Sequence, residues 1–415
     1  MREYIKKRIE AVRYGEVSEG YAETAAGCIP TDWSGAPLSE ISDVLSEQAG
    51  DRDFETLSIS AGIGFVNQAE KFGKELSGKQ YAKYIVLRRG DFAYNKGNSK
   101  RYPQGCTYML RERDEAAVPN VFECFRITQG HPEYYEQLFI NGFMNKQLTR
   151  KINHGVRDDG LLNLTDDDFY STIFPVPPLA EQRKIADILA TCDQVIELKQ
   201  QLLEEKRHQK QWLMQKLLDP DSGVRLPGYE NSEWYTVTLD EYCDCLDTLR
   251  KPVNAQQREK MQGNYPYWGA NSIQGYINDY LFDEEIVLLA EDGGCFDDFK
   301  TKPIAVYVKE KCWVNNHAHI LRAKNGNTKL LYFILVHKDI RNYINGTTRS
   351  KLTQGDMMSI AVTLPKSPQE QKRLIEVLTA CETEIELLEQ ELAVWQQKKK
   401  ALMQLLLTGL VRVNA

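Results

Sequence analysis

Glu181-Gln182-Arg183-Lys184-Ile185-Ala186-Asp187-Ile188-Leu189 returns 189 residues later as Glu370-Gln371-Lys372-Arg373-Leu374-Ile375-Glu376-Val377-Leu378. The similarity continues without a gap to Leu218 and Leu407, and 15 of the 38 aligned pairs are identical. Solenoid repeats have periods of roughly 20–50 residues, so a repeat this long has another origin. The duplication predicts two whole domains, each followed by the same long helix.

The second copy has the pattern of a coiled coil. Its apolar residues recur at steps of four and three, which is the 3.5-residue period of a coiled-coil seam, and only Lys399 interrupts them. Ser367 and Pro368 form a helix-start signature, Glu370 completes a capping box, and Gly409 is a C-terminal stop signal. The pattern predicts one continuous helix of about 38 residues.

The first copy keeps this frame, although Lys199, Lys206 and Lys210 occupy three of its seam positions. Because a whole domain lies between the copies, we expect the two helices to pack on each other antiparallel. Two unrelated amphipathic helices, each packed on its own domain, are the alternative. The seam residues that we expect to hold the helices together or to dock partners are Ile185, Leu189, Ile196, Leu203, Leu213, Leu374, Leu378, Ile385, Leu392 and Leu402.

The composition is that of an ordinary soluble protein with two or three domains. The 415 residues are 42% hydrophobic and 27% charged, and no apolar run approaches the roughly 20 residues that cross a membrane. The N-terminus lacks the apolar core of a signal peptide, and the nine cysteines contain no CxxC pair. These features favour a reduced, cytoplasmic protein. The net charge of −7 argues weakly against nucleic-acid binding, but it averages over faces with different roles.

The domain entrances repeat as well as the helices. Ile29-Pro30 leads to Trp33, Leu226-Pro227 leads to Trp234, and a leucine follows each tryptophan after five residues. The interiors between entrance and exit share no convincing residue-level similarity. We therefore predict an N-terminal segment 1–28, a first domain 29–176, a first repeated helix 177–222, a second domain 223–365 and a second repeated helix 366–415.

Both domain interiors read as mixed α+β. Residues 84–87, 286–289 and 304–308 are rich in β-branched and aromatic side chains and predict strands. Residues 133–148 and 329–344 predict helices. The fold class that follows is two globular α+β domains with two long antiparallel coiled-coil helices, related by a pseudo-two-fold internal repeat.

Each domain also carries a basic block. Residues 71–113 contain eleven Lys and Arg against three Asp and Glu, and residues 301–351 contain ten against two. Lys and Arg neutralise phosphates, while the interspersed amides can pair with base edges. The blocks favour DNA binding, with a solvated basic face as the alternative.

We find no convincing catalytic motif. The sequence has no phosphate-binding loop and no dinucleotide fingerprint. Glu291 and Asp292, followed by Lys300 and Lys302, could form a nuclease-like set, but a turn after a strand explains them as well. His317 and His319 share a strand face without an evident third ligand, so we expect them to be structural or to face DNA, with no metal.

Two motifs are similar to those of a known family, namely Pro177-Pro178-Leu179-Ala180-Glu181-Gln182 at the start of the first long helix and Ile29–Trp33 at the domain entrance. They resemble the hallmark that opens the long helices, and the domain entrance, of the specificity subunits of type I restriction-modification systems. Residues 84–96 and 265–270 resemble parts of their target-recognition domains. One departure is Ser367-Pro368-Gln369 in place of the second Pro-Pro-Leu.

The resemblance implies a non-catalytic subunit whose two domains each read one half of a bipartite DNA site. The coiled coil would set the spacing, and the repeated helices would dock two modification (methyltransferase) subunits, which two restriction subunits would join. S-adenosylmethionine, ATP and Mg²⁺ would then be bound by those partners. The residues that we assign to DNA contact are Tyr94, Lys96, Lys100, Arg101, Arg157, Lys302, Asn316, Arg349 and Lys351.

Two other functions remain open from the sequence. One is a stand-alone DNA nuclease using Glu291 and Asp292, and the other is a coiled-coil scaffold that binds no DNA. One more sequence similarity concerns the C-terminus: Gly409-Leu410-Val411-Arg412 resembles Gly223-Val224-Arg225, the run that leads into the second domain. We therefore expect the C-terminus to lie near residues 1–28.

Overall fold

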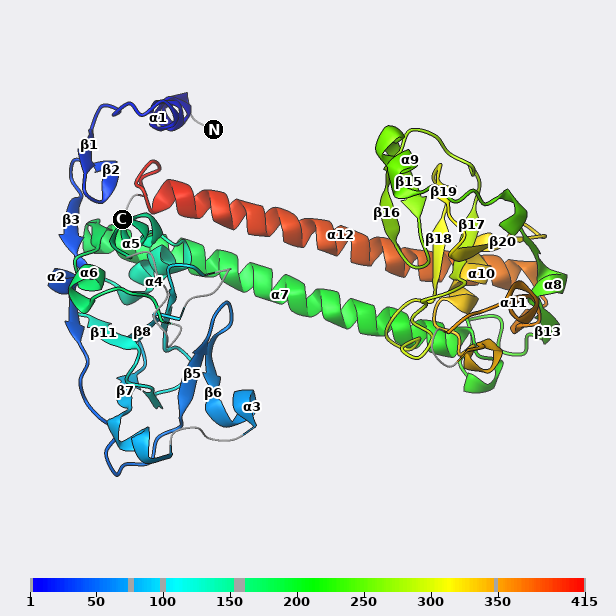
Figure 1. Ribbon diagram of the computed structural model, residues 1–415, viewed down its shortest axis with the longest axis horizontal. Helices are drawn as coiled ribbons and strands as arrows, with labels where there is room; N and C mark the ends of the chain where they lie inside the picture. Colours follow the sequence, from blue (N-terminus) through cyan, green and yellow to red (C-terminus); the bar gives the residue numbers. More distant parts are fainter. Residues whose placement is uncertain (1–2, 74–77, 98–101, 153–160, 347–349, 414–415) are drawn as a thin grey trace. The chain divides into compact units, whose positions relative to one another are not determined.

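The computed structural model describes all residues except 1–2, 74–77, 98–101, 153–160, 347–349 and 414–415 (Figure 1). The chain divides into two compact units, one formed by residues 1–198 with 392–415 and the other by residues 199–391. Helices α7 (Leu179–Leu217) and α12 (Pro368–Leu406) have 39 residues each, and each contributes to both units. Within the described part of the chain, no helix is both long and apolar enough to cross a membrane.

The first unit combines short strands with short helices. Its elements before α7 are α1 (Glu3–Arg13), β1 (Tyr21–Thr24), β2 (Gly27–Pro30), β3 (Ser34–Pro37), α2 (Leu38–Ile41), β4 (Ser42–Val44), β5 (Leu57–Ser60), β6 (Gly64–Asn67), α3 (Gln68–Phe72), β7 (Ile85–Arg88), β8 (Phe92–Asn95), β9 (Cys106–Met109), β10 (Glu115–Val118), β11 (Glu123–Ile127), α4 (Pro132–Ile140), α5 (Asn145–Lys151), α6 (Asp166–Tyr170) and β12 (Ile173–Val176). Strand β3 at the entrance pairs antiparallel with β12 at the exit.

The centre of this unit is a four-stranded antiparallel sheet with the strand order β4-β11-β8-β9. Strand β8 is buried on both faces of the sheet. Phe92 and Tyr94 join the core that includes α4 and α6, and Ala93 joins a second core on the other face. A strand covered on both sides loses the alternation of apolar and polar residues.

The second unit has the same kind of composition. Its elements between α7 and α12 are β13 (Trp234–Thr238), α8 (Leu239–Tyr242), β14 (Cys243–Cys245), α9 (Ala255–Lys260), β15 (Gln262–Trp268), β16 (Ile273–Ile277), β17 (Ile286–Ala290), β18 (Ala305–Val308), β19 (Trp313–Val314), β20 (Ala318–Ala323), α10 (Thr328–Leu335), α11 (Gln354–Met358) and β21 (Ala361–Pro365). Strands β13 and β21 pair at the entrance and exit.

The central sheets of the two domains have one topology, although their sequences differ. The second sheet has the strand order β14-β20-β17-β18, which matches the first sheet strand for strand. In each unit a hairpin is inserted between the first strand of the sheet and its next strand in the chain, β5–β6 in one and β15–β16 in the other. The internal repeat therefore extends to the central sheets, whereas the smaller sheets differ: β7 pairs with β10 in the first unit, and β19 joins β15 in the second.

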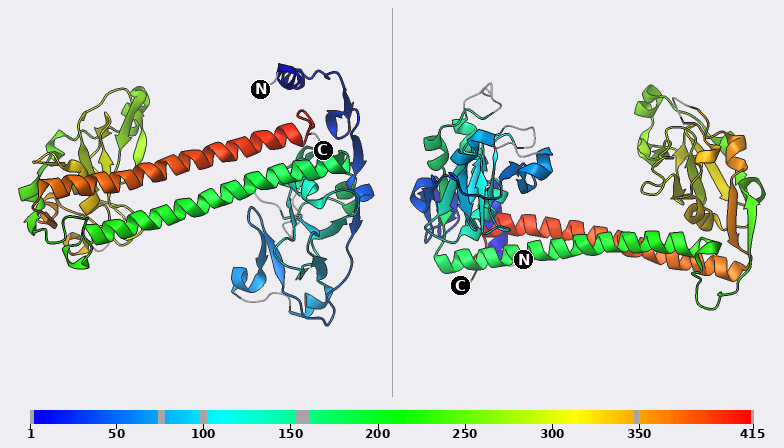
Figure 2. Two further views of the ribbon diagram at one scale, coloured as in Figure 1. Left: turned by 180° about the vertical axis from the view of Figure 1, so that it is seen from behind. Right: turned by 90° about the horizontal axis from the view of Figure 1, so that it is seen from below.

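The long helices pack through the predicted seam, and repeat-equivalent residues make equivalent packing contacts in each unit. In the first unit Ile185 and Leu189 of α7 lie in one core with Met403 and Leu406 of α12. In the second unit the equivalent residues Leu374, Leu378, Met214 and Leu217 are all buried and pack with α10. The start of α7 meets the end of α12, and the end of α7 meets the start of α12, so the helices pair antiparallel within each unit (Figures 1 and 2).

Two predicted helices are shorter than expected. Residues 133–148 form α4 and part of α5, and the chain turns at Gly142, which has a left-handed φ of +66°. Residues 329–344 form α10 and, after a break, a single 3₁₀ turn at 341–343. In the first case Asn141-Gly142 is a turn signal that outweighs the helical periodicity.

The segment that follows α12 lies beside the N-terminal segment, in line with the prediction for the C-terminal end of the chain. The Tyr21 hydroxyl donates a 2.6 Å hydrogen bond to the carbonyl of Gly409. Gly409 has a φ of +69°, and a Cβ there would lie 2.5 Å from Cγ of Pro30. Gly409, which follows α12, is thus fixed as glycine both by its backbone conformation and by the close approach of Pro30.

Candidate nucleic-acid interface

The residue that follows the equivalent strands β8 and β17 occupies the same place in both domains but carries the opposite charge. Phe125 pairs with Phe92 in the first sheet and Leu321 pairs with Val287 in the second, so Lys96 and Glu291 are equivalent positions just past the strand. Their carbonyl oxygens accept the N–H of Leu162 and Leu352, at 2.9 and 2.8 Å. One frame therefore presents a lysine in one domain and a glutamate in the other.

In the first domain the structure corrects two of the predicted DNA contacts. Tyr94 is fully buried, stacks on Phe169 and donates its hydroxyl to the carbonyl of Gln104, so it belongs to the core. Lys96 is nearly buried, and its ammonium lies 2.6 Å from Glu123 and 2.7 Å from Asp166. Neither side chain is available for DNA in this arrangement.

The remaining first-domain candidates, Lys100, Arg101 and Arg157, lie outside the described residues. Of the second-domain candidates, Arg349 also lies outside them. Lys302 and Lys351 are exposed, with carboxylate partners Asp298 at 2.6 Å and Glu291 at 3.3 Å. Asn316 lines a cavity, so these three remain predicted DNA contacts.

The equivalent position in the second domain holds a closed polar cluster. Glu291 accepts a 2.6 Å hydrogen bond from Arg250, which also pairs with Asp247 at 3.2 Å. His319 is buried, with Nδ1 2.6 Å from Asp247 and Nε2 2.9 Å from the carbonyl of Leu352. Burial opposes ionisation of Asp247, but His319 and Arg250 outweigh it and lower the pKa of this carboxyl.

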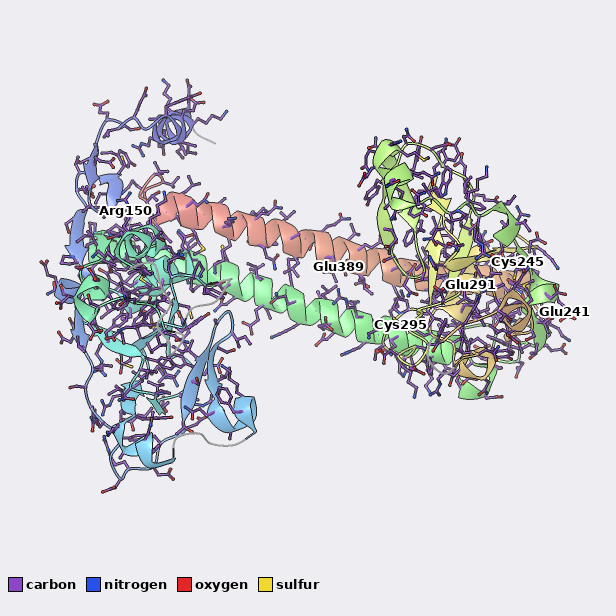
Figure 3. The ribbon with its side chains drawn as sticks, viewed as in Figure 1. Arg150, Glu241, Cys245, Glu291, Cys295 and Glu389 are labelled. Atoms are coloured by element: carbon purple, nitrogen blue, oxygen red, sulfur yellow. The ribbon has the colours of Figure 1, made fainter. Side chains whose placement is uncertain are left out.

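This cluster accounts for residues that the sequence left ambiguous. Asp247, Glu291 and His319 could together ligate a metal ion by distance, and Asp247 is a partner that sequence reasoning missed. Each already has a protein partner, and Arg250 brings a positive charge to the same place. The geometry is that of an ion-pair network that joins the end of β17 to Leu352, and Glu291 of this network is labelled in Figure 3.

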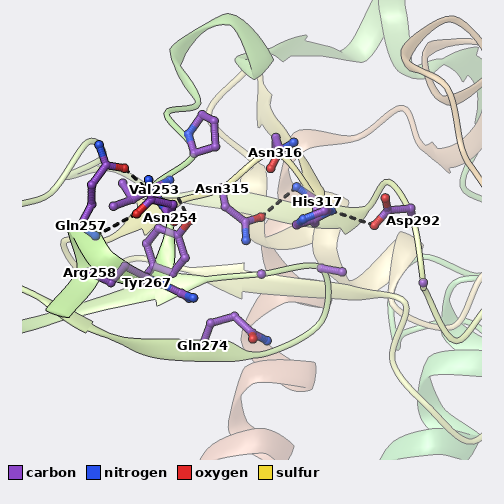
Figure 4. Close-up of a pocket in the computed structure, with 14 residues that line it drawn as sticks. Val253, Asn254, Gln257, Arg258, Tyr267, Gln274, Asp292, Asn315, Asn316 and His317 are labelled. Carbon is purple, nitrogen blue, oxygen red and sulfur yellow. Dashed lines mark hydrogen bonds and ion pairs between the residues drawn. The ribbon is translucent and has the colours of Figure 1, made fainter.

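A polar cavity of about 690 Å³ opens beside this cluster, between α9, the β15–β16 hairpin and the 315–317 loop (Figure 4). Arg258 of α9 lies over the ring of Tyr267, 5.1 Å from its centroid. His317, on the opposite wall, lies 3.0 Å from Asp292. The other polar lining is mainly amides, namely Asn254, Gln257, Gln274, Asn315 and Asn316.

Sequence reasoning missed most of this cavity. It identified Asn316 and the motif at residues 265–270, but not Arg258 or Gln274. A local signal existed, because Asn254 and Gln257 form a capping box that starts α9 and so fixes where Arg258 projects. The pairing of β15 with β16, in which Tyr267 lies opposite Gly275, is what brings Gln274 to the cavity, and this is a tertiary contact.

On the helices, the predicted seam residues occupy the least exposed positions. Ile185, Leu189, Leu203, Leu374 and Leu378 are buried. The other predicted seam residues, Ile196, Leu213, Ile385, Leu392 and Leu402, are partly buried. The seam therefore packs the two helices together and leaves any partner contact to other positions.

The seam lysines are matched by glutamates on the opposite helix. In the second unit Lys199, Lys206 and Lys210 of α7 pair with glutamates of α12 at 2.6, 2.8 and 2.9 Å. The partners in that order are Glu391, Glu384 and Glu382. Glu382 also pairs with Lys329 of α10 at 2.9 Å, which ties α12 to the second domain.

The repeated Glu-Gln pair joins each helix to its own domain. Gln182 donates to the carbonyl of Pro177 and accepts the N–H of His131, both at 2.8 Å. Its equivalent Gln371 donates to the carbonyl of Pro365 and accepts from the Asn327 side chain, both at 2.7 Å. Both glutamines are buried, so the second residue of the repeated motif is structural.

The same four-stranded sheet order in both units, each joined to a copy of the repeated long helix, defines an internally duplicated two-domain protein. The family model described as "Type I restriction modification DNA specificity domain" matches residues 124–205 and 231–395, more than half of the chain. The chain belongs to this family. It is a specificity subunit of a type I restriction-modification system.

Relatives and solved structures agree with this assignment. A Methanocaldococcus jannaschii protein named as the type I restriction enzyme MjaX specificity subunit is 24% identical over 95% of this chain and 97% of its own length. A specificity subunit from Haemophilus influenzae is 34% identical, but the match spans 37% of this chain and 40% of that protein. The crystal structure of the S subunit from M. genitalium shares the fold, with a TM-score of 0.60 at 15% identity over 90% of this chain and 96% of that one.

Proposed function

We propose that this chain is a non-catalytic subunit whose two domains each read one half of a bipartite DNA site. The observation that carries the proposal is the four-stranded sheet order, present twice in one chain of the DNA-specificity family. A frame that is repeated while its side chains differ suits two readers of different sequences, because sequence is read by side chains at base edges.

The carboxylates that a nuclease would need are already paired within the protein, which supports the non-catalytic proposal. Glu291 is committed to Arg250, and Asp292 lies beside His317. We infer that S-adenosylmethionine, ATP and Mg²⁺ act in partner subunits, as the family resemblance implies. The assembly would work in the cytoplasm, where its DNA is.

We further propose that two copies of one modification subunit dock on the repeated helices, and that two restriction subunits join them. Leu198 of α7 and Leu387 of α12 are repeat-equivalent, and they are 63% and 54% exposed. A large apolar side chain kept on the surface at the same place in both copies suits two identical contacts. The seam residues are already occupied by the opposite helix.

The test is reconstitution with the modification subunits, followed by mapping of methylated adenines on random-sequence DNA. We expect a single motif made of two short sequences separated by a fixed unspecified gap. No motif, or a continuous one, would refute the proposal. L198D and L387D should each reduce the number of bound modification subunits from two to one, while the exposed control L202D should not.

A further inference from the structure

Among the described arginines of the second domain, Arg258 is the one whose guanidinium has neither a hydrogen-bond acceptor nor a carboxylate partner among the described residues. Arg258 has no carboxylate partner among the residues that the structure describes, although Arg250 and Arg322 of the same domain each have two. Its guanidinium instead lies over the ring of Tyr267. An arginine held on an aromatic ring keeps its hydrogen-bond donors free for a ligand.

The ring below Arg258 is a fixed platform. Tyr267 is only 2% exposed, and its hydroxyl both donates to the carbonyl and accepts the N–H of Val253, each at 3.2 Å. Strand β15 carries the ring, and α9 immediately before it carries the arginine (Figure 4). The guanidinium therefore has a defined place at the cavity, with Gln274 on the neighbouring strand β16.

The surroundings of Arg258 indicate what it would bind. The rest of the polar lining is mainly neutral amides such as Gln274 and Asn316, and the one carboxylate of the lining, Asp292, lies 3.0 Å from His317 on the far wall. A phosphate track would be lined by several exposed cations. A single rigid fork among amides suits a base edge, and the O6 and N7 acceptors of guanine match the arginine fork.

We propose that Arg258 determines specificity for a guanine in the half-site read by the second domain. The β15–β16 hairpin would enter the major groove, which is wide enough for a two-stranded ribbon. Tyr267 is the positioning residue that holds the fork. This inference rests on the proposed function, since it names one base that the second reader selects.

The test compares the methylation motifs of the reconstituted complex carrying wild-type, R258A or R258K chains. We expect the wild-type motif to contain one G·C pair at which R258A loses at least about tenfold of its discrimination. R258K should lose it too, because an ammonium cannot present the bidentate fork. The other half-site and the gap should not change.

Arg341 provides the control, because it is a surface arginine of the same domain paired with Asp339 at 2.7 Å. R341A should leave the motif unchanged. The inference is overturned if R258A and R258K keep the wild-type motif, or if they weaken binding equally on all sequences and lower its salt dependence, as a phosphate contact would. If R258A does not fold, R258K alone decides. A wild-type complex without a bipartite motif would refute the proposed function instead.

Discussion

The indole Nε1 of Trp33 donates a 3.0 Å hydrogen bond to Oε2 of Glu181, which joins the entrance of the first domain to the start of α7. Arg412, near the end of the chain, pairs with the same carboxylate at 2.7 Å and lies over the Trp33 ring. In the second unit Arg225 lies over Trp234 in the same way. Arg412 of the C-terminal segment thus packs on the entrance tryptophan of the first domain, as Arg225 of the segment after α7 packs on the entrance tryptophan of the second.

The repeat-equivalent residues Glu181 and Glu370 differ in how many hydrogen-bond donors their carboxylates face. Glu181 is 3% exposed and accepts from Trp33 and Arg412. Glu370 is 1% exposed and accepts from Ser232 at 3.0 Å, but its other oxygen has no hydrogen-bond partner among the described residues. Burial raises the pKa of the Glu370 carboxyl.

The first prediction is that E181Q destabilises the protein, while E370Q does not. E181Q replaces an acceptor that faces two donors, and we expect a loss of about 2–3 kcal/mol in the free energy of unfolding. Because the pKa of Glu370 is raised on folding, its ionisation costs stability as the pH rises through the folded value. E370Q should therefore be near neutral below the unfolded value of about 4.3 and stabilising at pH 8. Urea unfolding followed by tryptophan fluorescence measures the free energy of unfolding of both variants. An equal loss in E181Q and E370Q would contradict the predicted difference between the two glutamates.

The second prediction concerns acid stability. Burial alone would raise the pKa of Glu382, but Lys210 and Lys329 more than compensate and lower it. A carboxyl with a lowered folded pKa contributes stability above its unfolded value of about 4.3 and loses it as the pH falls through the folded value. Below pH 4.3 the unfolding midpoint should therefore fall less steeply in E382Q than in the wild type. E386Q, one helical turn away and exposed, is the control. Parallel slopes for E382Q and wild type would rule out the contribution.

Much of the frame was predictable from sequence because it depends on local periodicity. The heptad steps and the Ser367 cap fix α12 without reference to the rest of the chain. Tyr94 was misassigned because β8 is buried on both faces, so a polar aromatic in a strand gave no sign of which way it faced. The Arg258 cavity was missed because strand pairing, rather than spacing, assembles it.

The third prediction separates two seam lysines that look alike in sequence. Lys206 pairs with the half-exposed Glu384, whereas Lys210 pairs with Glu382, whose side chain is 15% exposed. K206L should raise the free energy of unfolding by about 1 kcal/mol, since a surface ion pair contributes little and leucine fills the seam. K210L should lower it, because it removes a partner from a largely buried carboxylate. Thermal melts of the two variants in one buffer would test this, and a gain in both would show that Lys329 alone satisfies Glu382.

The fourth prediction tests whether the helices set the distance between half-sites. Deleting residues 199–205 and 385–391 together removes one heptad from each helix. The two deleted segments face each other, since Lys199 pairs with Glu391, so the seam stays in frame. Each helix shortens by about 10 Å at ~1.5 Å per residue, which corresponds to about three base pairs. The methylation motif of the reconstituted complex should keep both half-sites and lose about three base pairs from the gap. Deleting either heptad alone takes the seam out of register, so that variant should be less stable than the double deletion. An unchanged gap in a folded double deletion would show that something other than the helices fixes the spacing.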